Sequence, residues 1–480
     1  MILESLFGLY RPRFARTVVY MLQATEYRLV PYLKWFWRTS NFSRVMHRKS
    51  LVMSKPAKLL LAVFSFGLLV QYVAAIWLFI WAVNNHHLGV PFYAASLLIV
   101  APIIWAHLVV LPLLLGRWLV IGPYYGLQVW RSARVFKLHP GIKIAVAGSY
   151  GKTTMKEILL TVLSEGQRVA ATPANKNVSI SHAQFAKSLK GNEEILIIEY
   201  GEGAPGDVQR FSRCTSPTLG IITGLAPAHL DRYKTLQRAG KDIFSLAAYL
   251  KNKNLFVNAE AAALKPFIKK SHILYSSKRV GNWKISAIKT SIKGVEFTLK
   301  HKKNTYRLKS KLIGRHQVGP LALAAVLAHE AGLNKKQILT GVSKIEPFEH
   351  RMQPYQHSGA WIIDDTYNGN IEGMRAGLEL LKELPAKRKI YITPGLVDQG
   401  KDSKKIHQEL GEAIAKAKPD TVVLMKHSVT DSILSGLAKA KYKGESVIEE
   451  DPLTFYSNLD HYVAAGDLVL MQNDWPDQYQ

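Results

Sequence analysis

Residues 142–166 read IKIAVAGSYGKTTMKEILLTVLSEG, and this stretch decides the fold. The apolar run from 142 to 147 predicts a short buried strand, and a glycine-containing loop follows it. Apolar residues then recur at the spacing of a helix, at Ile158, Leu159, Val162 and Leu163. The order strand, glycine loop, helix predicts a phosphate-binding loop, in which backbone N–H groups and the helix N-terminus hold phosphates.

Each residue type in the loop suits a nucleotide. We expect contacts to the nucleotide from Gly148, Ser149, Tyr150, Gly151, Lys152, Thr153 and Thr154. Lys152 would neutralise phosphate charge, and the hydroxyl of Thr153 would bind Mg²⁺. The next apolar run, 195–198, ends at Glu199, which places a carboxylate at the carboxyl edge of the same predicted sheet. A carboxylate there predicts a second ligand for Mg²⁺.

After residue 360 the sequence alternates between two patterns. Strand-like runs (WIID, KIYITPG, TVVLMK, DLVLMQN) are separated by helical ones such as MRAGLELLKEL and KIHQELGEAIAKA. This alternation predicts a separate α/β domain of Rossmann-like topology.

The shortened loop GSYGKTT, 148–154, resembles that of the Mur ligase family, the ATP-dependent amide-forming enzymes of peptidoglycan precursor synthesis. The stretch EYGEGAPGD from Glu199, the RMQ at 351–353 and the DDTYNGN at 364–370 are similar to the MurF type within that family. The resemblance implies an α/β fold with an ATP-binding central domain at 141–345 and a Mur ligase C-terminal domain at 346–480. It also implies ATP and Mg²⁺ as cofactors.

The resemblance assigns roles to residues at matching positions. It implies a catalytic set of Lys152, Glu199, His229 and Lys241, with His229 on a second metal and Lys241 carbamylated to bind Mg²⁺. On the nucleotide side it implies Gln317 near adenine, Arg351 on the phosphates and Asp365 on the ribose. For the substrate side it implies Thr172, Asn175, Asn177, Asn368, Asn370 and His407. Gln317 and Pro320 stand where the family has asparagines.

Length and composition exclude several classes of protein. At 480 residues the chain is long enough for two or three domains, and 48% hydrophobic with 20% charged residues is typical of a folded chain. Cys214 is the single cysteine, so an intrachain disulfide and a cysteine-based zinc site are both excluded. This cysteine usage favours a reducing compartment.

Two long apolar runs, 59–83 and 90–115, lie ahead of the phosphate loop. About twenty apolar residues suffice to cross a bilayer, so the pair predicts a two-helix transmembrane hairpin at 58–122. Before it, residues 1–57 read as a basic, amphipathic arm that lies on anionic lipid or, as an alternative, as a solvated basic arm. Residues 123–140 read as a linker. Lysine and arginine flank both runs, which places both termini and the catalytic domains in the cytoplasm.

The net charge of +28 indicates a polyanionic partner. Residues 1–137 hold fifteen Lys and Arg against two acidic residues, so the densest charge flanks the apolar runs. Anionic membrane lipid is the partner that this distribution favours. The sequence contains no recognition motif for nucleic acid, and none is expected as a partner.

Together these features predict an ATP-dependent ligase at the cytoplasmic membrane face. By the resemblance it would add a dipeptide such as D-Ala-D-Ala to a muropeptide carboxylate, UDP- or lipid-linked, through an acyl phosphate. Two alternatives within the family stay open, a membrane-anchored poly-γ-glutamate synthase and a lipid II amidating subunit. A third is a nucleotide-binding membrane scaffold without ligase activity.

Overall fold

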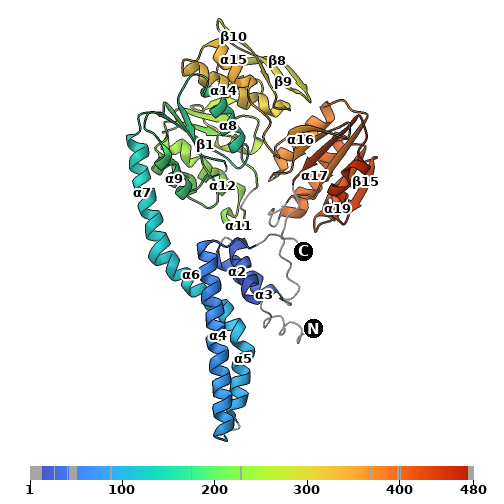
Figure 1. Cartoon of the computed structure of the whole chain (residues 1–480). Helices are drawn as coiled ribbons and strands as arrows, with labels where there is room; N and C mark the ends of the chain where they lie inside the picture. The colour runs from blue at the N-terminus through green and yellow to red at the C-terminus, as the bar shows by residue number, and fades with distance from the viewer. Residues whose placement is uncertain are drawn as a thin grey trace. The chain divides into compact units, whose positions relative to one another are not determined.

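The computed structural model describes residues 13–25, 27–39, 42, 51–86, 89–174, 176–227, 230–367, 369–396, 399 and 402–473. The chain divides into two compact units, 1–127 and 128–480, shown in Figure 1.

The first unit is helical. Helices α2 (Phe14–Ala24) and α3 (Leu29–Arg38) precede the long helix α4 (Lys55–Asn84). Ser54 caps α4 by accepting a hydrogen bond from the N–H of Ala57, and proline occupies the first turn, where its missing N–H is tolerated. Tyr32 of α3 donates its hydroxyl proton to the carbonyl oxygen of Ala106 at 2.8 Å, which ties α3 to the hairpin.

Consecutive helices follow α4 as far as Leu138. They are α5 (Gly89–Leu108), α6 (Val110–Gly116), the π-helix η2 (Arg117–Ile121) and α7 (Gly122–Leu138). The π-helix ends next to Pro123, which cannot donate a hydrogen bond to the preceding turn. The segment predicted to be a linker, 123–140, is therefore mostly helix. Its residue Phe136 is fully buried in the core of the second unit.

Helices α4 and α5 pack closely. Gly67 lies against the ring of Trp105, where a Cβ atom would approach ring carbons to 2.5 Å. The indole N–H of Trp105 donates to the side-chain oxygen of Gln71. Within the described residues, two helical segments are long and apolar enough to cross a membrane, Lys55–Asn84 and Pro102–Leu138.

The second unit begins with a mixed sheet that has ten strands among the described residues, in the order β10-β9-β8-β7-β6-β5-β4-β1-β3-β2. Strands β1 to β6 are parallel, and β7 to β10 are antiparallel. The strand bounds are β1 Ile142–Ala147, β2 Val169–Ala171, β3 Ile195–Glu199, β4 Leu219–Ile222, β5 Leu255–Asn258, β6 Ile273–Tyr275, β7 Arg279–Val280, β8 Trp283–Ser291, β9 Gly294–His301 and β10 Asn304–Ser310.

Helices cover both faces of this sheet, which is why the buried positions of β1 and β3 are apolar, with Lys143 and Glu199 as the exceptions. Ile144 and Val146 face α8 (Lys152–Leu163), α14 (Val318–Glu330) and α15 (Lys335–Ser343). Ala145 and Ala147 face α7, α9 (Ser179–Ser188), α10 (Asp207–Thr215), α12 (Leu236–Ile243) and α13 (Ser245–Tyr249). The short helices α11 (Leu230–Tyr233), η3 (Ala262–Phe267) and η4 (Arg315–Gln317) complete this part.

The C-terminal part is a second α/β sheet, with six strands among the described residues in the order β11-β12-β16-β13-β14-β15. Every strand except β11 is parallel. The bounds are β11 Gln353–His357, β12 Ala360–Asp365, α16 Ile371–Glu383, β13 Arg388–Thr393, α17 Ser403–Ala417, β14 Thr421–Met425, α18 Thr430–Lys439, β15 Glu445–Glu449, α19 Pro452–Ser457, α20 Leu459–Tyr462 and β16 Asp467–Gln472. Helices α16 to α18 cover one face, and α19 and α20 cover the other. The predicted fold, a phosphate-loop domain followed by a Rossmann-like domain, is confirmed.

Candidate active site

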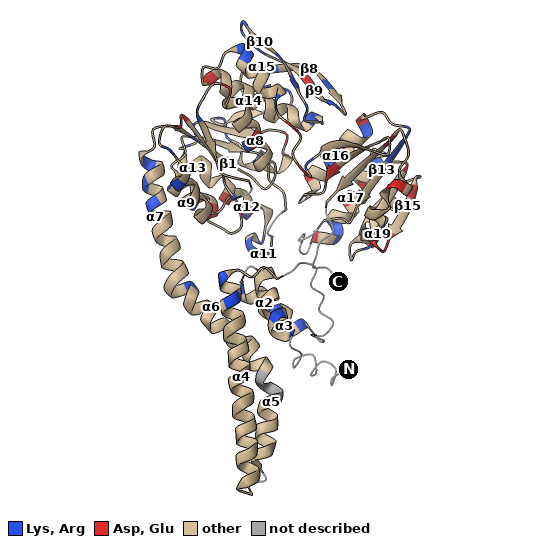
Figure 2. Ribbon diagram, viewed as in Figure 1, with Lys and Arg blue, Asp and Glu red and all other residues tan. Residues whose placement is uncertain are grey.

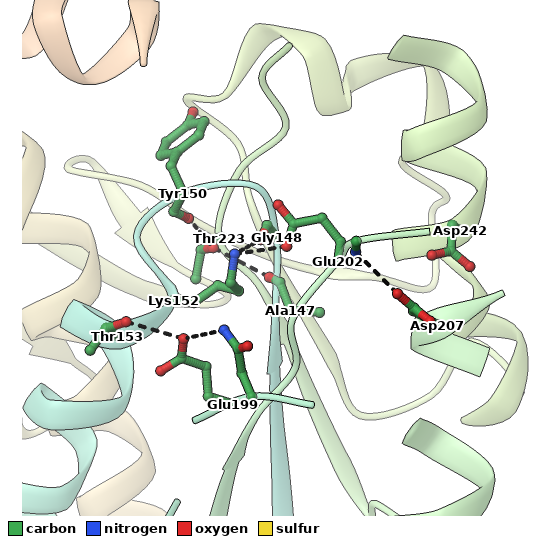
Figure 3. A network of polar contacts seen from close by, with 12 residues as sticks. Ala147, Gly148, Tyr150, Lys152, Thr153, Glu199, Glu202, Asp207, Thr223 and Asp242 are labelled. Carbon is green, nitrogen blue, oxygen red and sulfur yellow. Dashed lines mark hydrogen bonds and ion pairs between the residues drawn. The ribbon is translucent and has the colours of Figure 1, made fainter. Parts of the chain in front are cut away.

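The loop between β1 and α8 has the backbone that phosphate binding requires. Gly148 has φ +144° and Gly151, the N-cap of α8, has φ +74°, conformations that other residues rarely adopt. A Cβ atom at Gly148 would lie 2.3 Å from the hydroxyl oxygen of Thr223, so glycine is required there. Thr223 itself donates to the carbonyl oxygen of Tyr150, which holds the loop against the end of β4 (Figure 3).

Two further residues of this loop, Ser149 and Tyr150, contact Gly224 after β4. The N–H of Ser149 donates to the carbonyl oxygen of Gly224 at 2.9 Å, and the ring of Tyr150 lies against Gly224. Thr154 lies half-buried in the first turn of α8. The N–H of Ser149 is therefore already used, and the free donors of the α8 N-terminus are the ones that can face a phosphate.

Lys152 is paired with a buried carboxylate. Its ammonium group donates to Glu202 Oε2 at 2.8 Å and to the carbonyl oxygen of Gly148 at 2.5 Å (Figure 3). The two side chains are 12% and 4% exposed, so little water screens the pair. The sequence analysis did not single out Glu202. The available signal was a second acidic residue in EYGE, three positions after Glu199.

Glu199 at the end of β3 and Thr153 in the first turn of α8 are in direct contact. The Thr153 hydroxyl donates to Glu199 Oε1 at 3.1 Å (Figure 3). The Asn177 side-chain N–H donates to the same oxygen, also at 3.1 Å. Glu199 Oε2 is buried and accepts no hydrogen bond from any described residue. A threonine hydroxyl beside a carboxylate whose second oxygen accepts no hydrogen bond fits Mg²⁺, which prefers such oxygen ligands, although the Lys156 ammonium lies 3.5 Å from that oxygen.

A lysine missed by the sequence analysis lies behind this site. Lys156 is fully buried, and its ammonium nitrogen lies 3.5 Å from Glu199 Oε2 and 3.2 Å from Glu157 Oε1. It also donates to the carbonyl oxygen of Ala174 in the predicted substrate loop. Lys156 therefore links α8, the end of β3 and that loop. Its position one turn after Lys152 on an otherwise buried helix face was the available signal.

The predicted substrate loop is partly corrected. Thr172 is 1% exposed, and its hydroxyl accepts the backbone N–H of Glu199 at 3.1 Å, so it supports Glu199 instead of facing a substrate. Asn177 also contacts Glu199, through its side-chain amide. Asn175 lies outside the described residues.

The two further metal ligands that the resemblance implies stay predictions. His229 lies outside the described residues. Lys241 is exposed on α12, whereas its neighbour Asp242 is buried and accepts hydrogen bonds from the N–H of Gly206 and the hydroxyl of Tyr233, both at 2.8 Å. Within the described residues, no group of three His, Cys, Asp or Glu side chains could hold a metal ion.

In the C-terminal domain, Asp365 lies at the end of β12. Its carboxylate accepts the side-chain N–H of Gln472 at 2.7 Å and the backbone N–H of Met352 at 3.2 Å. Burial raises the pKa of Asp365 to about 7, and the positive charge of Arg351 opposes that rise. The guanidinium of Arg351 lies 4.2 Å from the centre of the Tyr367 ring. The predicted ribose and phosphate ligands, Asp365 and Arg351, are therefore close enough to interact.

Two predicted substrate residues make hydrogen bonds within the C-terminal domain. His407 is fully buried, accepts the N–H of Leu396 at 2.9 Å and bonds the carbonyl oxygen of Ser403 at 2.7 Å. Burial lowers the pKa of His407, so the neutral ring braces the loop after β13. Asn370 is the N-cap of α16, and its side-chain oxygen accepts the N–H groups of Glu372 and Gly373.

The roles of two other predicted residues stay predictions. Asn368 lies outside the described residues. Gln317 is half-buried in η4, where its amide contacts the ring of His316 at 3.0 Å. Its role beside adenine stays a prediction.

The middle and C-terminal domains match known families. Residues 146–328 match the Mur ligase middle domain, and residues 350–472 match the glutamate ligase domain of Mur ligases. The chain belongs to the Mur ligase family. Its members are ATP-dependent, ADP-forming ligases, and the two matched domains are the two α/β parts described above.

Related sequences are named as MurF ligases. The UDP-N-acetylmuramoyl-tripeptide–D-alanyl-D-alanine ligase of Escherichia coli is 26% identical over 62% of this chain and 68% of its own length. The enzyme of the same name from Bacillus subtilis is 26% identical over 58% of this chain and 61% of its own. The chain thus spans about two thirds or less of these relatives.

Solved structures of the same kind share the fold. MurF from Acinetobacter baumannii superposes with a TM-score of 0.62 at 20% identity, over 72% of this chain and 76% of that one. MurF from Thermotoga maritima, solved in complex with ADP, gives a TM-score of 0.61 at 21% identity, over 73% and 80% of the two chains.

Proposed function

We propose that this Mur ligase is of the MurF type and joins a dipeptide such as D-Ala-D-Ala to the carboxylate of a muropeptide, using ATP. The observation that carries the proposal is the grouping of Lys152, Thr153 and Glu199 at the carboxyl edge of β1 and β3. The names of the relatives support the choice of substrates.

The chemistry follows from the poor reactivity of a carboxylate as an acyl donor. Transfer of the ATP γ-phosphoryl group to a carboxylate oxygen makes an acyl phosphate and releases ADP. The amine of the dipeptide then attacks the acyl carbon, the amide bond forms, and phosphate leaves. No nucleophilic side chain of the protein is needed for either step.

The residues of the chain bind and neutralise the reacting phosphates. The N-terminus of α8 holds phosphate oxygens, and Lys152 offsets their charge. Thr153 and Glu199 would hold Mg²⁺, which supplies further neutralisation of phosphate charge when bound. Asp365 accepts hydrogen bonds from ribose hydroxyls, and Arg351 reaches the phosphates.

The first unit anchors the enzyme in the cytoplasmic membrane, with both termini and the catalytic domains in the cytoplasm. Support comes from the two apolar helical segments and from the lysine and arginine residues at their flanks. An anchored ligase would meet a lipid-linked or membrane-delivered muropeptide more often than a soluble one.

The test is phosphate release by the detergent-solubilised full chain with ATP and Mg²⁺. The acceptors compared are UDP-N-acetylmuramoyl-tripeptide and its lipid-linked counterpart, each with D-Ala-D-Ala. We expect release that depends on the acceptor, is lost in Lys152→Ala, and persists in the matched control Lys187→Ala, an exposed lysine of α9. Stimulation by neither acceptor would contradict the proposal and favour a nucleotide-binding scaffold.

A further inference from the structure

The positive charge of the chain is concentrated in two places. Residues 278–311 hold eleven Lys and Arg and one acidic residue, an excess of ten. With the excess of thirteen in residues 1–137, this leaves an excess of only five for the remaining 309 residues. The second concentration is denser than the one around the apolar runs, which corrects the expectation that the densest charge flanks those runs. It coincides with the antiparallel strands β8, β9 and β10, as the distribution of Lys and Arg in Figure 2 shows.

Strand pairing brings these charges onto one face. Across β8, β9 and β10 the aligned rows are Lys284–Lys300–Thr305, Ser286–Thr298–Arg307 and Lys289–Glu296–Lys309. The opposite face is apolar and buried in the core beneath α14, through Trp283, Val295, Phe297, Leu299, Tyr306 and Leu308. We call the five basic residues of these rows, Lys284, Lys289, Lys300, Arg307 and Lys309, the cationic sheet face.

The charges on this face are poorly compensated. All five basic side chains are exposed, and among the described residues the one ion pair recorded on the face joins Lys309 to Glu296 at 2.9 Å. Lys284 and Lys300 stand directly opposite each other on neighbouring strands, an arrangement that is destabilising. Neighbouring strands are about 4.8 Å apart, well inside the Debye length of about 8 Å in physiological salt. Cations on neighbouring strands therefore act on a partner together.

We propose that the cationic sheet face binds the anionic headgroups of membrane lipids. The inference rests on the membrane anchoring proposed above, because a tethered domain meets the lipid surface at a high effective concentration. Exposed lysines near an anionic bilayer gain electrostatic attraction without specific contacts.

The composition of the face favours lipid over nucleic acid. None of the nine aligned residues is aromatic, so the face offers no platform for stacking bases. Four of its five cations are lysine, whose ammonium group interacts with phosphate as a point charge and reads base edges less well than arginine does.

The experiment measures lysine acetylation in the full chain, reconstituted into nanodiscs. One set of discs holds phosphatidylcholine alone, and the other holds equal parts of phosphatidylcholine and phosphatidylglycerol. We expect Lys284 and Lys300 to be acetylated about fivefold more slowly in the anionic discs, with the difference lost at high salt. The exposed lysines Lys405 and Lys416 of α17 are the internal reference and should react equally in both.

A double substitution tests whether the protection comes from the cationic sheet face and not from the overall positive charge of the chain. In Lys284→Ser with Lys300→Ser, the protection of Lys309 in anionic discs should be lost. It should persist in Lys405→Ser with Lys416→Ser. The first variant removes a like-charge pair, so its folding is not at risk.

Three results would overturn the proposal. Equal acetylation of the face in both kinds of disc would leave the anchoring intact and contradict lipid binding. Protection by a DNA or RNA oligonucleotide in neutral discs, with none by phosphatidylglycerol, would assign the face to nucleic acid. Failure of the chain to enter either kind of disc would contradict the anchoring itself, and the lipid proposal would fall with it.

Discussion

Glu202 gives the lysine of the phosphate loop a partner within the protein. Because Lys152 is held by a carboxylate that is almost fully buried, a phosphate must compete with Glu202 for the same ammonium group. Glu202→Gln keeps the shape and removes the negative charge. We expect this variant to bind ADP about tenfold more tightly, which corresponds to about 1.4 kcal/mol, as measured by isothermal titration calorimetry without Mg²⁺.

The control for that measurement is Glu165→Gln. Glu165 pairs with Lys344 at 2.7 Å, where the lysine is largely exposed, and exposed pairs contribute little. The affinity of Glu165→Gln for ADP should match that of the natural chain. Weaker ADP binding by Glu202→Gln that appears only when Mg²⁺ is present would show instead that Glu202 helps to hold the metal.

Asp365 should make the stability of the C-terminal domain depend on pH. Burial raises the pKa of its carboxyl from 3.8 to about 7, so the folded state binds the proton more tightly than the unfolded state. The free energy of unfolding should therefore fall as pH rises from about 4 to about 7 through this group. In Asp365→Asn this part of the pH dependence should vanish, which thermal unfolding at a series of pH values would measure. A slope unchanged by the substitution would assign the titration to another group.

The nucleotide-binding part of the site was predictable from the sequence, because its chemistry lies in contiguous residues. Lys152 and Thr153 follow one strand, and Glu199 ends the neighbouring strand, so parallel pairing of β1 with β3 brings them together. Glu202 and Lys156 were not predicted. Their importance comes from burial and from partners distant in sequence, which no local pattern of residues reveals.

At the scale of the elements, Asn370 shows how a residue of a family motif can serve its helix. Its side-chain oxygen caps α16 by accepting two N–H groups, at 3.1 and 3.0 Å. Asn370→Ala should lower the free energy of unfolding by about 1 kcal/mol, while Asn370→Asp, which keeps the acceptor, should be close to neutral. Chemical denaturation would measure both. Loss of ligase activity in Asn370→Asp at unchanged stability would restore a role toward the substrate.

Two substitutions in the antiparallel strands β8 to β10 should change the free energy of unfolding in opposite directions. Lys300→Thr removes a charge that faces Lys284, so we expect the free energy of unfolding to rise by about 0.2–1 kcal/mol. Lys309→Thr removes a charge that faces Glu296, so we expect a fall of similar size. Thermal unfolding of the two variants would compare them directly. A rise for both would mean that strand propensity, not charge, dominates at these positions.

Most parallel strands were predicted because they are continuous apolar runs. The runs at 142–147 and 195–198 form β1 and β3, and the four runs after residue 360 form β12, β13, β14 and β16. Strands β8 to β10 were not predicted, although their apolar positions alternate with polar ones, which is the pattern of a half-buried strand. The helix α7 was not foreseen either, because its exposed polar and aromatic positions hide the buried face that carries Phe136.

At the scale of the whole molecule, the division near residue 127 separates the proposed membrane anchor from the nucleotide site. The core that surrounds the phosphate loop consists of residues beyond 128, with Phe136 of α7 among them. A chain lacking residues 1–127 should therefore still bind ADP with unchanged affinity, because the loop, Glu199 and Asp365 are all retained. Calorimetry would check this first, and weaker binding would mean that the first unit supports the site.

A second measurement on the same shortened chain tests whether the substrate is delivered at the membrane. If the first unit serves to meet a membrane-delivered muropeptide, its removal should lower kcat/KM for the lipid-linked acceptor much more than for the UDP-linked one. The comparison requires both acceptors, presented in the same detergent, with the full chain and Lys152→Ala alongside. Because ADP affinity is fixed by the first measurement, a selective loss would reflect substrate delivery and not damage to the nucleotide site. Full efficiency of the shortened chain on the soluble UDP-linked acceptor, with no activity of either chain on the lipid-linked one, would contradict a membrane-borne substrate.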